Sequence, residues 1–293
     1  MHVNHLPPTD DAIVYRGNTI IYEAKIKGYG SRVFVKRPAS KHPSKQEIAA
    51  LENEHDLAYP ISCRSVRKVL GIEKSDGELL LVLQPINGHT LRDHLDGNQL
   101  DFNHRLQLAT AVVRSVHDLH THAIVHNELS ATNLLVSDTD HHSIVVIDLG
   151  SAVRNTSSCS RSGGSLKNEC LPYLPPERLT QGKIFADFRI DLYSTGVVLY
   201  EIMTGRPPFL SEDPQTLIHE HLALTPDEPS RFDIEIPDAI DRIILKLLAK
   251  DPDERYQSAY GLLMDLEKCL HQLHANGDVL PFYESLGFAI ERI

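Results

Sequence analysis

The hydrophobic pattern of the chain changes its period at Asn87-Gly88, and this change limits the fold more than any other feature of the sequence. Before this point, short β-branched or apolar runs are bounded by Gly, Asn and Asp, which is typical of strands. One helix is predicted among them, because Ser44 and Glu47 fit a capping box and Pro60 ends the helical pattern. The predicted strands span residues 12–15, 20–24, 32–36 and 79–83.

Beyond Asn87-Gly88 the apolar residues recur at helical spacing, interrupted by one short strand pair. The segment 151–168 has no period and is rich in Ser, Gly and Asn, and long irregular segments of this kind are usually functional. The predicted helices span 105–122, 191–204, 240–250 and 258–275, and the strand pair spans 134–136 and 144–147.

These patterns predict an α+β fold with a small β-rich lobe followed by a larger α-helical lobe. The expected domain plan is an N-terminal tail at 1–11, the small lobe at 12–86, the large lobe at 87–275 and a C-terminal tail or linker at 276–293.

Composition narrows the class of protein. The chain has 29 Lys and Arg against 40 Asp and Glu, a net charge of −11, which disfavours non-specific binding to nucleic acid or anionic lipid. Its four cysteines form no C-x-x-C pair, so neither a zinc cage nor a disulfide framework is expected. No apolar run is long enough for a signal peptide or a membrane span. We expect a cytoplasmic protein with no nucleic-acid partner and no membrane span.

A lysine and a glutamate of the small lobe form the first candidate pair. Lys36 ends the predicted strand 32–36, where burial of its amine is costly unless an anion meets it. Glu54 shares one face of the predicted helix with Leu51 and Ala58, and that face must meet the sheet. General surface statistics leave open the alternative in which Lys36 is an edge lysine and Glu54 a solvated helix charge.

A second cluster lies in the large lobe. Residues 126–133 read HNELSATN, and IDLG follows the strand pair at 147–150. These segments bring Glu128, Asn133 and Asp148 around one turn, as a carboxylate, an amide and a second carboxylate. Such hard oxygen ligands suit magnesium that also holds phosphate oxygens.

Together these residues resemble the signature set of the Ser/Thr-type protein kinase superfamily: a strand lysine, a helix glutamate, an H-R-D-L-x-x-x-N loop, D-F-G and A-P-E. Further along, Glu177 resembles the glutamate of A-P-E, Asp191 the central-helix aspartate that anchors the catalytic loop, and Arg255 the late arginine that pairs with Glu177. Within this superfamily, residues 249–282 resemble most the N-terminal kinase-like module of large multidomain sensor histidine kinases. In that family, ATPase and sensor domains follow in the same longer protein.

The resemblance implies a bilobal kinase fold that uses ATP and Mg²⁺. Lys36 would contact the phosphates and Glu54 would orient it, while Asn133 and Asp148 would hold the metal and Glu128 would act as the catalytic base. The remaining cofactor-binding candidates are Gly17 in the nucleotide loop and the backbones of Gln84 and Ile86 in the connector that faces the adenine. The implied partner is a protein substrate or a signalling protein.

The chain departs from the family around the attacking hydroxyl. Glu128 replaces the catalytic aspartate, Ser130 a lysine and Cys170 a threonine. The extra methylene of Glu128 displaces its carboxylate, and a misplacement of about 1 Å can cost roughly a hundredfold in rate. Asn127 also replaces the arginine that reads a phosphorylated activation loop, so the Ser and Thr residues of 156–165 are expected to be a solvated loop rather than a switch.

Two functions therefore stay open. One is a Ser/Thr protein kinase that transfers the γ-phosphoryl group of ATP to a protein hydroxyl in signal transduction. The alternative is a pseudokinase that acts as a nucleotide-binding scaffold or regulatory module. A small-molecule phosphotransferase is disfavoured by Pro176-Glu177 and by the segment 191–196.

Overall fold

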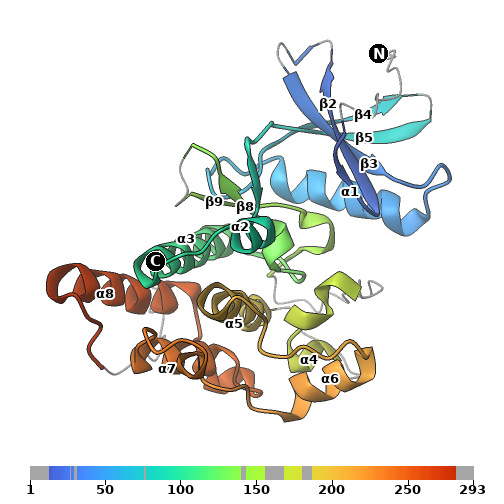
Figure 1. Ribbon diagram of the computed structural model, residues 1–293. Coiled ribbons are helices and arrows are strands. Elements are labelled where there is room, and N and C mark those ends of the chain that lie inside the picture. The colour runs from blue at the N-terminus through green and yellow to red at the C-terminus, as the bar shows by residue number, and fades with distance from the viewer. Residues whose placement is uncertain are drawn as a thin grey trace.

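The computed structural model describes residues 13–26, 28–29, 32–75, 77–139, 143–155, 168–179 and 187–281 of the chain. Its elements form two lobes, a sheet with one helix at the top of Figure 1 and a larger set of helices below. The predicted α+β architecture is confirmed. The irregular segment 151–168 was predicted to be functional, but most of it, 156–167, lies outside the described residues.

The small lobe is built on an antiparallel five-stranded sheet in the order β1-β2-β3-β5-β4. Four of its strands were predicted, and β4 was not. The fully buried residues of β4 are Val69, Gly71 and Ser75, so two of the three carry no apolar signal. The strands are β1 (Ile13–Arg16), β2 (Thr19–Lys25), β3 (Arg32–Pro38), β4 (Val69–Ser75) and β5 (Glu78–Leu83).

Helix α1 (Lys45–Ala58) packs against this sheet, as Figure 1 shows. Its start is the predicted capping box: the Glu47 backbone N–H donates to the Ser44 hydroxyl, and the Glu47 carboxylate accepts from the Ser44 N–H at 2.8 Å. The buried side chains of the helix include Leu51, Glu54 and Leu57. A local signal thus fixes where the helix begins, and its buried face directs Glu54 inward.

The large lobe is organised around helix α5, which is buried along almost its whole length. Helices α3 and α7 pack against α5, and α8 packs against α3. Helices α3, α5, α7 and α8 were predicted from their periodicity, whereas the shorter α2, α4 and α6 were not. The helices are α2 (Leu91–Gly97), α3 (Phe102–Thr121), α4 (Pro176–Leu179), α5 (Phe188–Thr204), α6 (Pro214–Ala223), α7 (Asp238–Leu247) and α8 (Ala259–Asn276).

Two small sheets carry the loops between the lobes. Strand β8 lies between β6 and β9, and β7 pairs with β10. The loop 126–133 leaves β7 and the loop 147–152 leaves β9, so the two predicted motif segments emerge side by side. The strands are β6 (Gly88–Thr90), β7 (Ile124–Val125), β8 (Leu134–Ser137), β9 (Ile144–Val146) and β10 (Val153–Arg154). The short 3₁₀ helices are η2 (Ala131–Asn133), η3 (Leu149–Ser151), η4 (Asn168–Tyr173), η5 (Pro229–Arg231) and η6 (Pro252–Glu254).

One apolar core runs through both lobes. It begins with Phe34 and Leu81 in the upper sheet, passes through Leu129 in the loop and continues along α5. The two motif loops are therefore backed by packed side chains rather than by solvent. Within the described part of the chain, no helix combines the length and the apolar character that crossing a membrane requires.

Candidate functional site

Lys36 is the centre of a buried ion-pair cluster. Its Nζ lies 2.6 Å from Oε2 of Glu54 and 2.8 Å from Oδ1 of Asp148. The Lys36 and Glu54 side chains are 6% and 4% exposed, so the alternative of two solvated surface charges is wrong. Lys36 lies on β3, an inner strand, and that position turns its amine toward α1 rather than toward water.

The carboxylates around Lys36 oppose the effect of its burial. Burial lowers the pKa of Lys36, but the carboxylates of Asp148 and Glu54 more than offset this, and the net direction is upward. Burial raises the pKa of Glu54, while Lys36 acts against that rise. Two carboxylates face one ammonium, which keeps Lys36 protonated.

Arg67 supplies a further positive charge that sequence analysis missed. It is 7% exposed, and its guanidinium lies over the Phe34 ring at 5.4 Å. Burial lowers its pKa to about 10, and the charge of Glu54 opposes that shift. Arg67 lies just before β4 in a stretch with no period, so no local pattern marked it.

Asn53 ties helix α1 to the loop that carries Asp148. Its Nδ2 lies 3.2 Å from the carbonyl oxygen of Leu149, 3.1 Å from that of Gly150 and 2.9 Å from that of Ala152. The loop comes so close to α1 that a Cβ added at Gly150 would lie 3.3 Å from the Ala50 Cβ. Sequence analysis missed Asn53, since a polar residue beside Glu54 carries no signal of its own.

Asp148 occupies a backbone conformation that few non-glycine residues adopt. Its φ is 62° and its ψ is 69°, in the left-handed region. Its Oδ1 accepts from the Gly150 N–H at 3.4 Å as well as from Lys36. Strain of this kind persists where surrounding contacts hold it, and it clusters at functional sites.

Asp191 of α5 anchors the loop 126–133 through hydrogen bonds to its backbone. The Asp191 carboxylate is completely buried and accepts from the backbone N–H of His126 at 2.7 Å and of Asn127 at 3.0 Å. His120 lies 3.0 Å from the same carboxylate. Because two successive N–H groups are fixed to the central helix, the position of the next residue, Glu128, is set by the fold.

Asn133 links the two motif loops. Its Nδ2 donates to the Glu128 carbonyl at 2.8 Å, and its backbone carbonyl accepts from the Ile147 N–H at 3.0 Å. Because the side-chain nitrogen of Asn133 donates to this carbonyl, the side-chain oxygen is the atom that can bind a metal ion. Together with the Asp148 carboxylate it forms the kind of hard oxygen donor set that magnesium prefers. The donors present thus fit a magnesium ion.

The three residues that depart from the family pattern around the attacking hydroxyl are all buried. Glu128 is 6% exposed, Ser130 is completely buried, and Cys170 is 5% exposed. The Ser130 hydroxyl lies 3.0 Å from that of Thr132. The loop 126–133 therefore keeps a carboxylate at position 128 but has no lysine at position 130.

The nucleotide-contact candidates lie on the sheet side of the site. The Gln84 N–H donates to the Lys68 carbonyl at 3.0 Å, so of its backbone groups Gln84 can offer only the carbonyl to a ligand. Gly17 forms the turn from β1 to β2, and its N–H donates to the Thr19 carbonyl at 3.0 Å. A Cβ at Gly17 would lie 2.4 Å from the Tyr15 hydroxyl, which is the far end of an exposed side chain and could move aside.

Glu177 and Arg255 form a framework ion pair below the site. Both guanidinium Nη atoms lie 2.8 Å from a Glu177 carboxylate oxygen, and Arg255 is 2% exposed. Two-point pairing of this kind fixes geometry as well as charge. It holds the start of α4 to the loop before α8, as the resemblance predicted.

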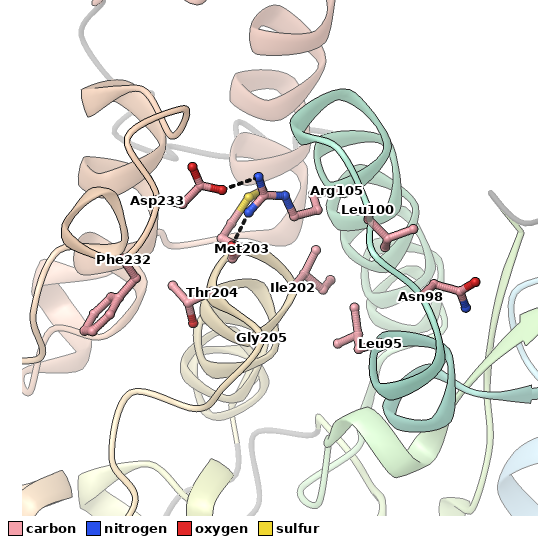
Figure 2. A pocket seen from close by; sticks show the side chains of 10 residues that line it. All are labelled: Leu95, Asn98, Leu100, Arg105, Ile202, Met203, Thr204, Gly205, Phe232 and Asp233. Carbon is pink, nitrogen blue, oxygen red and sulfur yellow. Dashed lines mark hydrogen bonds and ion pairs between the residues drawn. The ribbon is translucent and has the colours of Figure 1, made fainter.

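A pocket of about 230 Å³ lies elsewhere in the large lobe, between the start of α3 and the end of α5 (Figure 2). Arg105 crosses it and donates to Oδ2 of Asp233 at 2.6 Å and to the Met203 carbonyl. None of the predicted site residues lines this pocket. Arg105 thus pairs with a carboxylate and a carbonyl, and its contact with Met203 joins the start of α3 to the end of α5.

Comparison with known proteins matches the chain to protein kinases. The sequence model described as the protein kinase domain matches residues 17–267 of the chain. A probable serine/threonine-protein kinase of Streptomyces coelicolor is 35% identical over 192 residues, which are 65% of this chain and 28% of the relative.

Two further relatives extend the comparison. A probable serine/threonine-protein kinase of Clostridium perfringens is 29% identical over 254 residues, 86% of this chain and 36% of the relative. The serine/threonine-protein kinase PknB of Mycolicibacterium smegmatis is 30% identical over 188 residues, 64% of this chain and 29% of the relative. The chain spans about a third of the length of these relatives.

Proposed function

Because this chain belongs to the protein kinase family, we propose that it binds ATP with Mg²⁺ between its lobes and transfers the γ-phosphoryl group to a Ser or Thr hydroxyl of a protein. The observation that carries the proposal is the position of Lys36 between two carboxylates, Glu54 on α1 and Asp148 in the loop 147–152. A charged amine held at this depth is suited to phosphate oxygens.

The other candidate residues have proposed roles in binding magnesium and ATP. Asn133 and Asp148 would hold magnesium, which when bound neutralises charge on the phosphates. The Gln84 carbonyl and the Ile86 backbone would meet the adenine, since Pro85 has no N–H. Gly17 would let the β1–β2 turn approach the phosphates.

Glu128 is the proposed base. In the transfer step the substrate hydroxyl oxygen bonds to the γ-phosphorus, and the bond from that phosphorus to the bridging oxygen breaks to release ADP. The hydroxyl proton passes to the Glu128 carboxylate. Positioning and electrostatics supply most of the catalysis in such a transfer, so a displaced base slows the reaction without abolishing it.

One observation favours a second candidate function, a nucleotide-binding scaffold without transfer. Glu128 is only 6% exposed, and a base must reach the hydroxyl proton within hydrogen-bond distance. If Glu128 stays buried when a protein partner binds, the chain signals through nucleotide-dependent binding alone. The narrower likeness to the kinase-like module of sensor histidine kinases, with its linked ATPase and sensor domains, stays a prediction.

Single-turnover transfer tests the proposal. Purified chain is mixed with magnesium and γ-labelled ATP, and label is followed on the chain itself and on dephosphorylated casein. We expect transfer by the unmodified chain, which Lys36→Ala reduces to background. ATP affinity, measured by calorimetry, should fall in the same variant, because the phosphates lose their buried cation.

The matched control is Lys41→Ala, which removes an exposed lysine of the same lobe. It should leave both affinity and transfer unchanged. Binding of ATP without transfer above the Lys36→Ala level would overturn the transferase proposal and leave the scaffold. No binding of ATP by the unmodified chain would overturn both.

A further inference from the structure

Asn127 joins the loop 126–133, which carries the proposed base, to the loop 147–152, which carries a proposed metal ligand. Its Nδ2 donates to the backbone carbonyl of Ser151 at 2.9 Å, and the residue is 1% exposed. The start of the loop 147–152 is attached as well, because the Ile147 N–H donates to the Asn133 carbonyl at 3.0 Å. Asp148 therefore lies between two attachments to the loop 126–133.

The backbone of Asn127 is itself fixed to the central helix. Its N–H donates to Oδ1 of Asp191 at 3.0 Å, and Asp191 on α5 is completely buried. The φ of Asn127 is 69°, in the left-handed region, which asparagine adopts more readily than most residues other than glycine. The side chain of Asn127 thus connects Ser151 to a position that α5 holds.

The side-chain amide of Asn127 is used through its nitrogen. Within the described part of the chain, its buried Oδ1 has no hydrogen-bond partner. The reverse orientation of the amide would set this oxygen against the Ser151 carbonyl, and two acceptors cannot form a hydrogen bond. An unpaired buried acceptor is unfavourable, so the contribution of Asn127 to the fold is its donor.

Two asparagine amides hold the loop 147–152 from different lobes. The Nδ2 of Asn53 lies within 3.2 Å of three of the four backbone carbonyl oxygens of 149–152, and Asn127 donates to the fourth. Asn53 belongs to α1, which packs on the sheet of the small lobe. Asn127 is tied to α5 in the large lobe, so its hydrogen bond does not depend on where α1 lies.

We propose that Asn127 is a positioning residue for Asp148, holding the loop 147–152 to the large lobe so that Asp148 keeps its place relative to Asn133 when α1 moves. The inference rests on the proposed function, because it concerns how the two proposed metal ligands are kept together. The hold on the loop is a property of the fold and can be measured without nucleotide.

Hydrogen exchange on the full chain tests the hold. Asn127→Gly removes the donor and keeps a residue that accepts a positive φ. Asn127→Asp keeps the size of the side chain but sets an acceptor against the Ser151 carbonyl. In both variants the hydrogen-bonded N–H groups of Ala152 and Asn155 should exchange about fivefold faster or more, because the loop opens more often.

Asn98 offers a matched control. Its Nδ2 also donates to a backbone carbonyl, that of His94 at 2.8 Å, but at the end of α2. Asn98→Gly should leave exchange at Ala152 and Asn155 unchanged. Exchange in both Asn127 variants equal to that of the unmodified chain would overturn the proposal. If Asn127→Gly fails to fold, Asn127→Asp decides by the same criterion.

Magnesium dependence separates positioning from a general loss of stability. ATP affinity without magnesium should be the same in Asn127→Gly as in the unmodified chain, because the Lys36–Glu54 pair is not attached to Asn127. The gain in affinity on adding magnesium should be about threefold smaller or less, since Asp148 is held less firmly. Asn53→Ala should instead lower affinity in both conditions, because it releases α1. A full magnesium gain in Asn127→Gly would overturn the positioning role.

Transfer by the unmodified chain distinguishes failure of this inference from failure of the proposed function. Where transfer occurs, Asn127→Gly should lower kcat by about tenfold. If the unmodified chain binds ATP and magnesium without transfer, the transferase proposal is wrong, and exchange and magnesium dependence still decide the role of Asn127. If it binds no ATP, the positioning role is overturned with the proposed function, and exchange alone decides whether Asn127 holds the loop.

Discussion

The side-chain amide nitrogen of Asn53 lies 2.9 Å from the carbonyl oxygen of Ala152, and this contact joins helix α1 to the loop that carries Asp148. The neighbouring residue on the helix, Glu54, pairs with Lys36, and Lys36 pairs in turn with Asp148. The Asn53 hydrogen bonds and the Glu54–Lys36–Asp148 ion pairs therefore both connect α1 to the loop 147–152. An outward movement of α1 would therefore break the amide contacts and the ion pair together.

We predict that Asn53→Ala weakens this assembly. The change removes the donor for carbonyl groups that are partly buried, and the free energy of unfolding should fall by about 1 to 2 kcal/mol. ATP affinity should fall as well, because the Lys36–Glu54 pair depends on the position of α1. Urea denaturation and calorimetry measure the two effects. Glu52→Ala, an exposed neighbour on the same helix, is the control and should change neither.

Magnesium dependence tests the proposed metal ligands. ATP affinity should rise when magnesium is added to the unmodified chain, and Asp148→Asn should abolish that rise because an amide is a weaker ligand than a carboxylate. Calorimetric titration with and without magnesium gives the comparison. Asp56→Asn, which alters an exposed carboxylate of α1, should keep the full dependence. An ATP affinity that does not change with magnesium in the unmodified chain would contradict the role of Asn133 and Asp148 as metal ligands.

The length of the side chain at position 128 decides between the two candidate functions. If Glu128 reaches too far, Glu128→Asp should raise transfer about tenfold, which is about 1.4 kcal/mol of barrier. If the fold has adapted to glutamate, Glu128→Asp should lower the rate and Glu128→Gln should nearly abolish it. Equal, background-level transfer by all three forms, with ATP still bound, would favour the scaffold.

The buried side chain of His221 should make the free energy of unfolding depend on pH. Burial, together with the charge of Lys250, lowers its pKa to about 4, and its Nδ1 lies 2.9 Å from the Tyr193 hydroxyl. The unfolded chain takes up this proton near the ordinary value of about 6.5, so the unfolded state binds more protons between pH 6.5 and 4. Stability should therefore fall as the pH falls through that range.

From this group alone, the loss between pH 7.5 and pH 5 should be about 2 kcal/mol. Urea denaturation at the two pH values measures it. His221→Phe should be less stable at pH 7.5, because the Tyr193 hydroxyl loses its partner, but should lose less stability on acidification. The control His219→Gln alters an exposed histidine of the same helix and should show the acid loss of the unmodified chain. An unchanged loss in His221→Phe would contradict the assignment.

The sequence by itself determined the features whose contacts are local. The Ser44–Glu47 capping box spans three residues, and the periodicity of α3, α5, α7 and α8 repeats within each helix, so both can be read along the chain. The two-lobed α+β plan followed from the change of period. The motif order also brought Lys36 and Asp148 into one hypothesis, because each lies in a short segment with a characteristic spacing.

Tertiary structure alone decided which charges meet and how each is held. Asn53 and Arg67 were not found from the sequence, because their partners lie on other elements and no local period marks a long-range contact. Strand β4 was missed because two of its three buried residues, Gly71 and Ser75, are small or polar. The left-handed backbone of Asp148 is also set from outside, by Lys36 and by the loop's approach to α1. Periodicity shows which face of an element is buried, but only the packing of the elements determines which atoms that face will meet.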